Sequence, residues 1–154
     1  MSLDAFQLPD SAPARIGDFH ALWFEKASGH VPDASDFDVG VLSRQYPLIA
    51  RIGTAGAGSE LVWRDVAQAD HWPFRTPVTG RPVAESVPPL MSVTRAINSF
   101  QETLTSGVPD YFETTSWLYG GRTSLMARLV APLAVGEARE LIALWEVMEP
   151  LETP

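Results

Sequence analysis

The apolar residues of the chain are densest in its last third, where two long runs flank a short polar segment. The runs span residues 122–135 and 140–149, and the four residues between them, Gly-Glu-Ala-Arg, have the composition of a hairpin loop. The pattern therefore predicts two long antiparallel strands joined by a four-residue loop. With that loop, the expected pairs are Val135 with Glu140, Leu133 with Ile142, Ala131 with Leu144 and Leu129 with Glu146.

Both faces of this predicted hairpin are apolar, and each is interrupted by one charged residue. Because side chains alternate along a strand, one face carries Glu146 together with Leu125, Ala127, Leu129, Ala131, Leu133, Ile142, Leu144 and Met148. The other face carries Arg128 together with Met126, Val130, Ala143, Trp145 and Val147. A sheet with one solvated face would alternate apolar and polar residues. We therefore expect cover on both faces, from helices on one and from a terminal helix or a second subunit on the other.

Helical periodicity predicts a helix over residues 13–27. Its apolar stripe, with spacings of three and four residues, consists of Ile16, Phe19, His20, Trp23 and Ala27. Asp10 or Ser11 is placed to cap the first turn. Leu22 and Phe24 widen the apolar zone. The helix is expected either to bury one ordinary face or to pack more extensively, on the outer face of the sheet or on another copy of itself.

The main helix is predicted over residues 90–105, which contain no proline or glycine. Gly107 followed by Pro109 should end it. Its apolar stripe is Leu90, Val93, Ala96, Ile97, Phe100 and Leu104.

Short elements are predicted between the two helices. Asp36 or Asp38 should cap a short helix that ends by Tyr46, because the following proline disfavours continuation. Residues 48–52 and 60–66 favour a first hairpin. The glycines between these strands lack the GK[ST] ending of a phosphate-binding loop, which argues against nucleotide binding there.

Prolines limit residues 70–89 to short helical turns and loop, and residues 110–119 favour a further strand before the C-terminal hairpin. The predicted order is therefore helix, two strands, short helices, a long helix and three strands.

Several strings accompany this order of elements. They are VPDASDFDVGVLSRQYPLIARIGT after the first helix, VTGRPVAESVPP before the long helix, SGVPDYFETT after it, and LVAPL and ELIALWE in the hairpin. Together they resemble the PAS-domain superfamily, and within it a short PAS-like family found mainly in alphaproteobacteria. The resemblance implies an α+β fold: a five-stranded antiparallel sheet with helices on one face and an N-terminal helix as additional cover. A single PAS-like domain is expected over residues 13–150, with a leader at 1–12 and a tail at 151–154.

Composition excludes several classes of protein. The chain has 154 residues, enough for one domain with its own core, and no cysteine, which excludes disulfides, thiolate metal ligands and a cysteine nucleophile. A net charge of -8 opposes direct contact with nucleic acid. The longest apolar run, residues 125–135, is too short to span a membrane, and the N-terminus lacks the features of a signal peptide. A cytoplasmic protein is expected.

Few residues suggest catalysis. His20, His30 and His71 lack the spacing of a zinc site, and no serine stands in a GxSxG motif. Glu146 could act in acid–base chemistry if burial raised its pKa, but pairing with a basic residue is the favoured interpretation. Arg128 could hold a ligand carboxylate or stack on a neighbouring indole, and the structural role is favoured.

Aromatic residues are the main candidates for binding, especially Trp63, Trp72, Phe74, Phe100, Trp117 and Trp145. The PAS resemblance implies a small-molecule site between the sheet and the helical middle, with Trp63, Phe100, Trp117, Arg128 and Trp145 as candidate contacts. An aromatic core without a ligand is an equal alternative. The lack of cysteine excludes chromophores linked through cysteine, and the lack of histidine in residues 90–105 argues against haem. The cofactor, if there is one, stays unknown.

These observations favour a non-catalytic sensory or regulatory PAS-like protein, of bacterial type, that signals through protein association. The expected partners are a second copy of the chain and a separate effector protein, with a small molecule as an optional ligand. Two alternatives stay open. One is a small enzyme of ketosteroid-isomerase-like fold that transfers a proton in an apolar pocket, which strand order would distinguish. The other is a structural adaptor whose pocket is filled by its own side chains.

Overall fold

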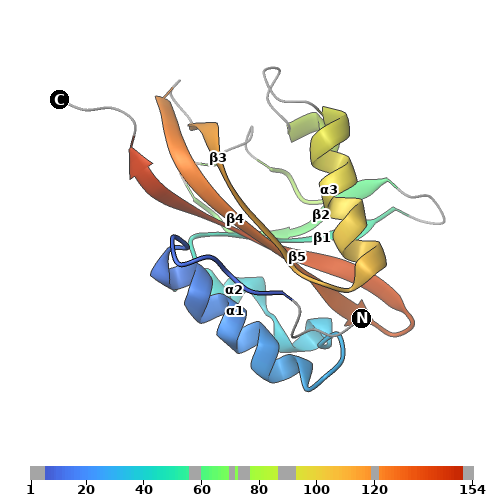
Figure 1. Ribbon diagram of the computed structural model, residues 1–154. Helices are drawn as coiled ribbons and strands as arrows, with labels where there is room; N and C mark the ends of the chain where they lie inside the picture. The colour runs from blue at the N-terminus through green and yellow to red at the C-terminus, as the bar shows by residue number, and fades with distance from the viewer. Residues whose placement is uncertain are drawn as a thin grey trace.

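The computed structural model describes residues 6–55, 60–69, 72, 77–86, 93–118 and 122–150. Side chains in these ranges are described except at residues 93, 114–118, 122–124 and 149–150. The described residues form an α+β fold in which one antiparallel sheet lies between helices on both sides (Figure 1).

The sheet has five strands in the order β2-β1-β5-β4-β3, and every neighbouring pair is antiparallel. Its strands are β1 (Leu48–Thr54), β2 (Leu61–Val66), β3 (Asp110–Leu118), β4 (Arg122–Val135) and β5 (Ala138–Pro150). The longest two form the C-terminal hairpin, and β5 lies at the centre of the sheet. The predicted α+β class, with a five-stranded antiparallel sheet and an N-terminal helix, is confirmed.

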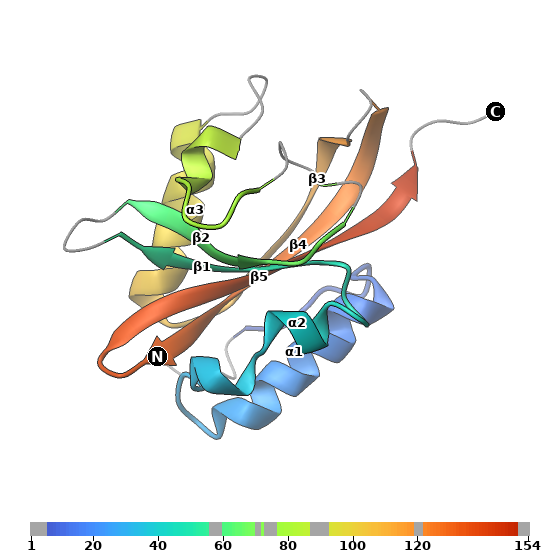
Figure 2. The same cartoon turned by 180° about the vertical axis from the view of Figure 1, so that it is seen from behind.

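Helices cover both faces of this sheet (Figures 1 and 2). One face, called the α1 face below, carries α1 (Ala14–Ala27), the 3-10 turn η2 (Ala34–Asp36) and the short α2 (Val39–Leu42). The opposite α3 face carries η3 (Val83–Ser86) and α3 (Val93–Ser106).

The N-terminal helix uses its apolar stripe within the same chain. Ile16, Phe19, Trp23 and Ala27 have no exposed surface, and the indole Nε1 of Trp23 donates a hydrogen bond of 2.9 Å to the carbonyl of Pro132 in β4. The cover expected on the outer face of the hairpin therefore comes from a terminal helix of this chain. The predicted helix boundaries, 13–27, are correct to within one residue.

The predicted register of the C-terminal hairpin is wrong by two residues. Val135 pairs with Ala138, so the loop contains only Gly136 and Glu137. The other observed pairs are Leu133 with Glu140, Ala131 with Ile142, Leu129 with Leu144 and Ala127 with Glu146. Gly136 has a φ of 59°, the conformation that a two-residue II′ turn requires at its first position. A shift of two residues preserves the side-chain alternation, so the faces were assigned correctly from the turn as far as Met126 and Val147, beyond which the register shifts.

The predicted side-chain cap of α1 is also wrong. Pro13 is the N-cap, and it makes no side-chain capping bond. Ser11 instead donates from its hydroxyl to Glu113 of β3, at 2.5 Å, so it fastens the leading segment to an edge strand. The cap predicted for the short helix is confirmed at Asp38, whose carboxylate accepts from the amide of Val41 at 3.3 Å.

The end of α3 follows the prediction. Gly107 adopts a φ of 72°, and its amide donates to the carbonyl of Thr103 at 3.1 Å. A left-handed residue after the last turn is the usual way in which glycine ends a helix. The predicted start at Leu90 lies outside the described residues.

Candidate functional site

Four of the five predicted site residues meet on the α3 face of the sheet. Trp63 comes from β2, Phe100 from α3, Arg128 from β4 and Trp145 from β5, and each is at most 3% exposed. Arg128 and Trp145 are cross-strand partners. Trp117 lies in β3 opposite Thr123, and its side chain is outside the described part of the chain.

A cluster of indole rings forms one half of this site. The ring centroids of Trp63 and Trp145 are 6.4 Å apart, and those of Trp72 and Trp145 are 5.9 Å apart in an edge-to-face arrangement. The indole Nε1 of Trp63 donates to the hydroxyl of buried Ser86 at 3.1 Å. The cluster is thus apolar, with its polar indole atom at Trp63 satisfied inside the protein.

Arg128 forms the other half, between two phenyl rings. Its guanidinium carbon lies 4.6 Å from the ring centroid of Phe100 in α3 and 4.0 Å from that of Phe112 in β3. Each distance is within the range of a cation–π contact. Arg128 therefore stacks on phenylalanines from a helix and a strand, whereas the stacking predicted from the sequence was on an indole.

The charge of Arg128 is balanced indirectly. Its Nη2 donates to the hydroxyl of Ser99 at 2.8 Å, and that hydroxyl donates to the carboxylate of Asp110 at 3.2 Å. Burial lowers the pKa of Arg128 to about 10, and the charge of Asp110 opposes this shift. The guanidinium is consequently still protonated at neutral pH.

One donor of Arg128 is unused. Its Nε is buried and has no hydrogen-bond partner among the described residues. A buried donor without a partner costs about 1–3 kcal/mol, so such groups call for a physical explanation. The site is therefore a packed apolar cluster that contains one cationic donor without a partner among the described residues.

Glu146, the candidate acid–base residue, lies on the opposite side of the sheet. Its carboxylate pairs with Arg15 of α1 at 3.5 Å, as the favoured interpretation predicted. Burial raises the pKa of Glu146, and the charge of Arg15 lowers it in part. Glu146 thus cannot act on a molecule bound beside Trp63 and Arg128, because the sheet separates them.

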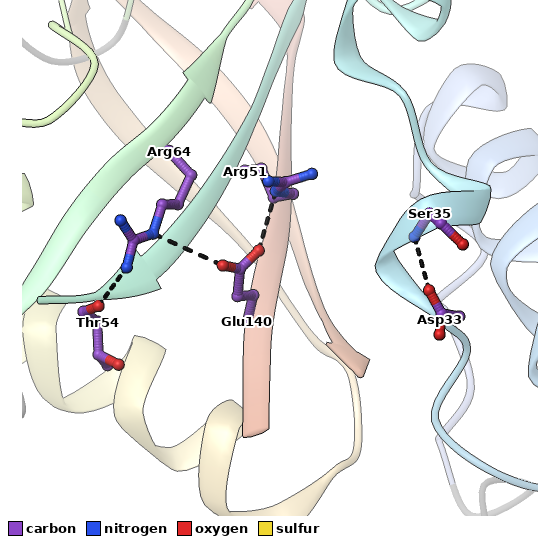
Figure 3. A network of polar contacts seen from close by, with 6 residues as sticks. All are labelled: Asp33, Ser35, Arg51, Thr54, Arg64 and Glu140. Carbon is purple, nitrogen blue, oxygen red and sulfur yellow. Dashed lines mark hydrogen bonds and ion pairs between the residues drawn. The ribbon is translucent and has the colours of Figure 1, made fainter. Parts of the chain in front are cut away.

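A second polar cluster lies near the hairpin end of the α1 face (Figure 3). Two arginines from adjacent strands converge on Glu140, with Arg51 at 2.9 Å and Arg64 at 3.6 Å. Arg64 also donates to the carbonyl of Thr54. Gly53 makes room for this arrangement, since a Cβ atom there would stand 2.5 Å from the Nε of Arg64. We interpret the cluster as a clamp across β1, β2 and β5, because each of its charges has an opposite partner.

The histidines do not form a metal site in the described part of the chain, where no group of three or more His, Asp or Glu residues could hold an ion. His20 packs against Phe6 and Trp23, and burial lowers its pKa. His30 is exposed, and His71 lies outside the described residues. Among the described helices, none has the length and apolar character needed to cross a bilayer.

Sequence reasoning missed the residues that complete the Arg128 site. No sequence pattern singled out Ser99, Asp110 or Phe112. Serines on helices, and acidic or aromatic residues at the start of a strand, occur in most proteins without a role in binding. Phe112 can be placed beside Arg128 only when the β3–β4 register is known, since the two are cross-strand partners. Trp72 was one of the aromatic residues that the sequence offered for binding, but its place beside Trp145 could not be predicted, because the sequence pattern did not define the course of its proline-rich segment.

Comparison with known proteins gave no match to a family model, to a curated protein or to a solved structure.

Proposed function

We propose that this chain is a sensory or regulatory PAS-like domain that binds a small molecule on the α3 face and signals through association with other proteins. The observation that carries the proposal is the burial of a charged arginine whose Nε has no partner among the described residues, next to Trp145, which packs against two further indole rings. Ligand sites are typically apolar surfaces with a few polar groups that fix the orientation of the ligand. The order of elements and the strings quoted above support the PAS-like character of the domain.

The enzyme alternative has less support. Proton transfer in an apolar pocket needs a carboxylate of raised pKa within reach of the substrate. Glu146 has the raised pKa, but it is paired with Arg15 on the face away from the aromatic site. The acidic group whose charge acts on Arg128 is Asp110, which is already bonded to the hydroxyl of Ser99.

The structural adaptor has one observation in its favour. Trp63 and Phe100 have no exposed surface, which is the packing expected if the chain fills the site with its own side chains. A ligand would then have no place without movement of α3. The two functions differ in a simple way, because only a ligand-binding domain gains stability from a small molecule.

The deciding experiment combines native mass spectrometry of the purified full chain with a thermal-shift screen of a metabolite library. A ligand at 100 times its Kd stabilises a protein by about 2.7 kcal/mol, which raises Tm by about 5 °C or more. Trp145→Phe and Arg128→Gln should reduce the shift, whereas Arg51→Gln, a change on the α1 face, should not. Sedimentation with and without each stabilising compound then tests whether binding changes association. A chain that carries no compound and is stabilised by none is a structural adaptor.

A further inference from the structure

We infer that the ligand of the α3 face is a monocarboxylate with an apolar body, and that its carboxylate takes the place of Ser99 and Asp110 as the partner of Arg128. The inference rests on the proposed ligand-binding function and adds the chemical class of the ligand and the way in which binding reaches α3.

The geometry of the guanidinium points to a carboxylate. The Nε–H and one Nη–H of an arginine lie parallel on one edge and match the two oxygens of a carboxylate. In Arg128 the Nε is buried without a partner, and the Nη2 is held by a neutral hydroxyl, that of Ser99. A carboxylate on this edge would satisfy the unused donor and would replace a hydroxyl by a charge-assisted bond.

The charge of the site points to a single negative charge. Arg128 is the buried cation among the described residues, where the other buried polar side chains are Ser86 and Thr103. One guanidinium can neutralise one carboxylate, but a phosphate dianion would leave an uncompensated charge in an apolar site, which is costly.

The surroundings point to an apolar body. The guanidinium is enclosed by the rings of Phe100 and Phe112, and Trp145 is its cross-strand partner. Trp145 in turn contacts Trp63 and Trp72. These indole rings and Phe100 are at most 3% exposed, so α3 must move for a ligand to enter. A hydrocarbon chain or an aromatic ring attached to the carboxylate would then meet apolar side chains.

Asp110 acts as an internal counter-ion that the ligand must displace. It reaches Arg128 through the hydroxyl of Ser99, and among the described residues the guanidinium has no direct ion pair. Ser99 belongs to α3 and Asp110 is the first residue of β3. A ligand that takes over the guanidinium releases Ser99, and α3 thereby loses a polar tie to β4.

The experiment compares matched acids and amides on the full chain. Octanoate and octanamide share one hydrocarbon chain, and phenylacetate and phenylacetamide share one ring, so each pair differs in charge at the polar end. Binding is measured by calorimetry and by the fluorescence of the tryptophans. We expect each acid to bind at least about tenfold more tightly than its amide, the factor typical of a charge-assisted hydrogen bond.

Three variants test whether the tighter binding of acids than of amides depends on Arg128. Arg128→Gln should reduce the acid-to-amide ratio to about one. Asp110→Asn should raise acid affinity by roughly threefold to tenfold and leave amide affinity unchanged, because a competing carboxylate is removed. Arg51→Gln removes an arginine of the α1 face and should leave the ratio as it is. Asp110 is only partly buried, so Asp110→Asn is expected to fold. It can therefore test the role of the site even if Arg128→Gln does not fold.

The outcomes separate this inference from the proposed function. If an acid and its amide bind equally well, the α3 face binds apolar molecules and the carboxylate assignment is overturned while the ligand-binding function stands. If neither binds, or if Asp110→Asn weakens binding of the acid, the inference is also overturned. The metabolite screen then decides by itself whether the domain has a ligand of another class.

Discussion

Two charged residues interrupt the apolar faces of the β4–β5 hairpin, and they are accommodated by different means. Arg128 is enclosed by two phenyl rings and tied to a hydroxyl, whereas Glu146 meets an arginine from α1. Strand alternation alone identifies both as exceptions, because each stands among apolar residues on its face. Their partners could not be predicted, since Ser99 and Arg15 are distant in sequence and lie on helices whose docking the sequence does not define.

Glu146 makes stability depend on pH in a definite direction. Burial raises its pKa, so the folded state favours the protonated carboxyl more than the unfolded state does. The resulting stabilisation is fully present below the unfolded pKa and is lost as the pH rises through the folded pKa. We expect Glu146→Gln to equal or exceed the wild type in stability at neutral pH, by less than about 1 kcal/mol. The difference in stability between Glu146→Gln and the wild type should vanish below about pH 4.

Urea unfolding at both pH values measures this effect. Arg15→Gln is the matched variant, and it should destabilise the protein at neutral pH because Glu146 loses its counter-charge. That loss should shrink as the carboxyl becomes protonated. A destabilisation by Arg15→Gln that is the same at both pH values would show that the pair contributes through packing.

The Arg51–Glu140–Arg64 clamp gives a second prediction for single residues. The side chain of Glu140 is 14% exposed, and it is the shared partner of two arginines on neighbouring strands. Glu140→Gln should destabilise the protein by about 1 kcal/mol, because the arginines then face each other without a counter-charge.

The control for this prediction is Arg64→Gln. Arg64 is 40% exposed, and Glu140 retains Arg51 in this variant. The loss should therefore be smaller, below about 0.5 kcal/mol. Denaturant unfolding compares the two variants, and equal losses would contradict the shared role of Glu140.

At the level of elements, the strands and helices could be predicted from the periodicity of apolar residues, but the turns could not, because they depend on local backbone angles. The prediction of a four-residue loop was wrong because Ala138 and Arg139, which have the composition of a loop, pair as the first residues of β5. Gly136 alone supplies the positive φ, and this permits the tighter turn. The end of α3 was predictable because Gly107 and Pro109 both oppose helix continuation.

The same hairpin turn stabilises the end of α3. Arg139, two residues beyond the turn, donates through Nη1 to the carbonyls of Leu104 and Thr105, at 2.8 and 3.1 Å. These carbonyls belong to the last turn, where an arginine is also favoured by the helix dipole. Arg139→Ala should therefore cost about 1 kcal/mol and fray the C-terminal turn of α3.

Hydrogen exchange of the α3 amides, together with denaturant unfolding, measures this loss. Arg139→Lys keeps the charge near the helix end but lacks the planar fork, so it should recover part of the stability. Unchanged exchange at residues 100–106 in the alanine variant would mean that the helix end does not depend on Arg139.

For the molecule as a whole, the two apolar faces of the hairpin were sufficient to predict a covered sheet. The sequence left open whether a helix or another subunit supplied the outer cover, because an apolar stripe fits both. The contacts of Trp23 and Arg15 with β4 and β5 assign this role to α1. The binding site was less predictable, because it depends on which side chains from α3 and β3 reach Arg128.

Self-association through α1 stays a prediction, but α1 leaves less apolar surface exposed for it than the sequence suggested. The stripe of Ile16, Phe19 and Trp23 is buried against the sheet, and Phe24, at 42% exposed, is the large apolar residue that α1 presents to solvent among those described. A deletion of residues 1–28 therefore removes the cover of the sheet. It is no longer a clean test of whether the intact chain forms a dimer.

We expect the chain without residues 1–28 to aggregate or to pair through the exposed α1 face, because removing α1 uncovers a face that includes Leu129, Leu133 and Leu144. Apolar patches of this kind are rarely left open on a monomer. Phe24→Ser, which changes the exposed side of α1, should keep the sheet covered and leave folding intact. Sedimentation velocity and circular dichroism of both variants test this. If the truncated chain stays folded and monomeric at tens of micromolar, α1 is an accessory to the sheet, and the argument that both faces need cover is wrong.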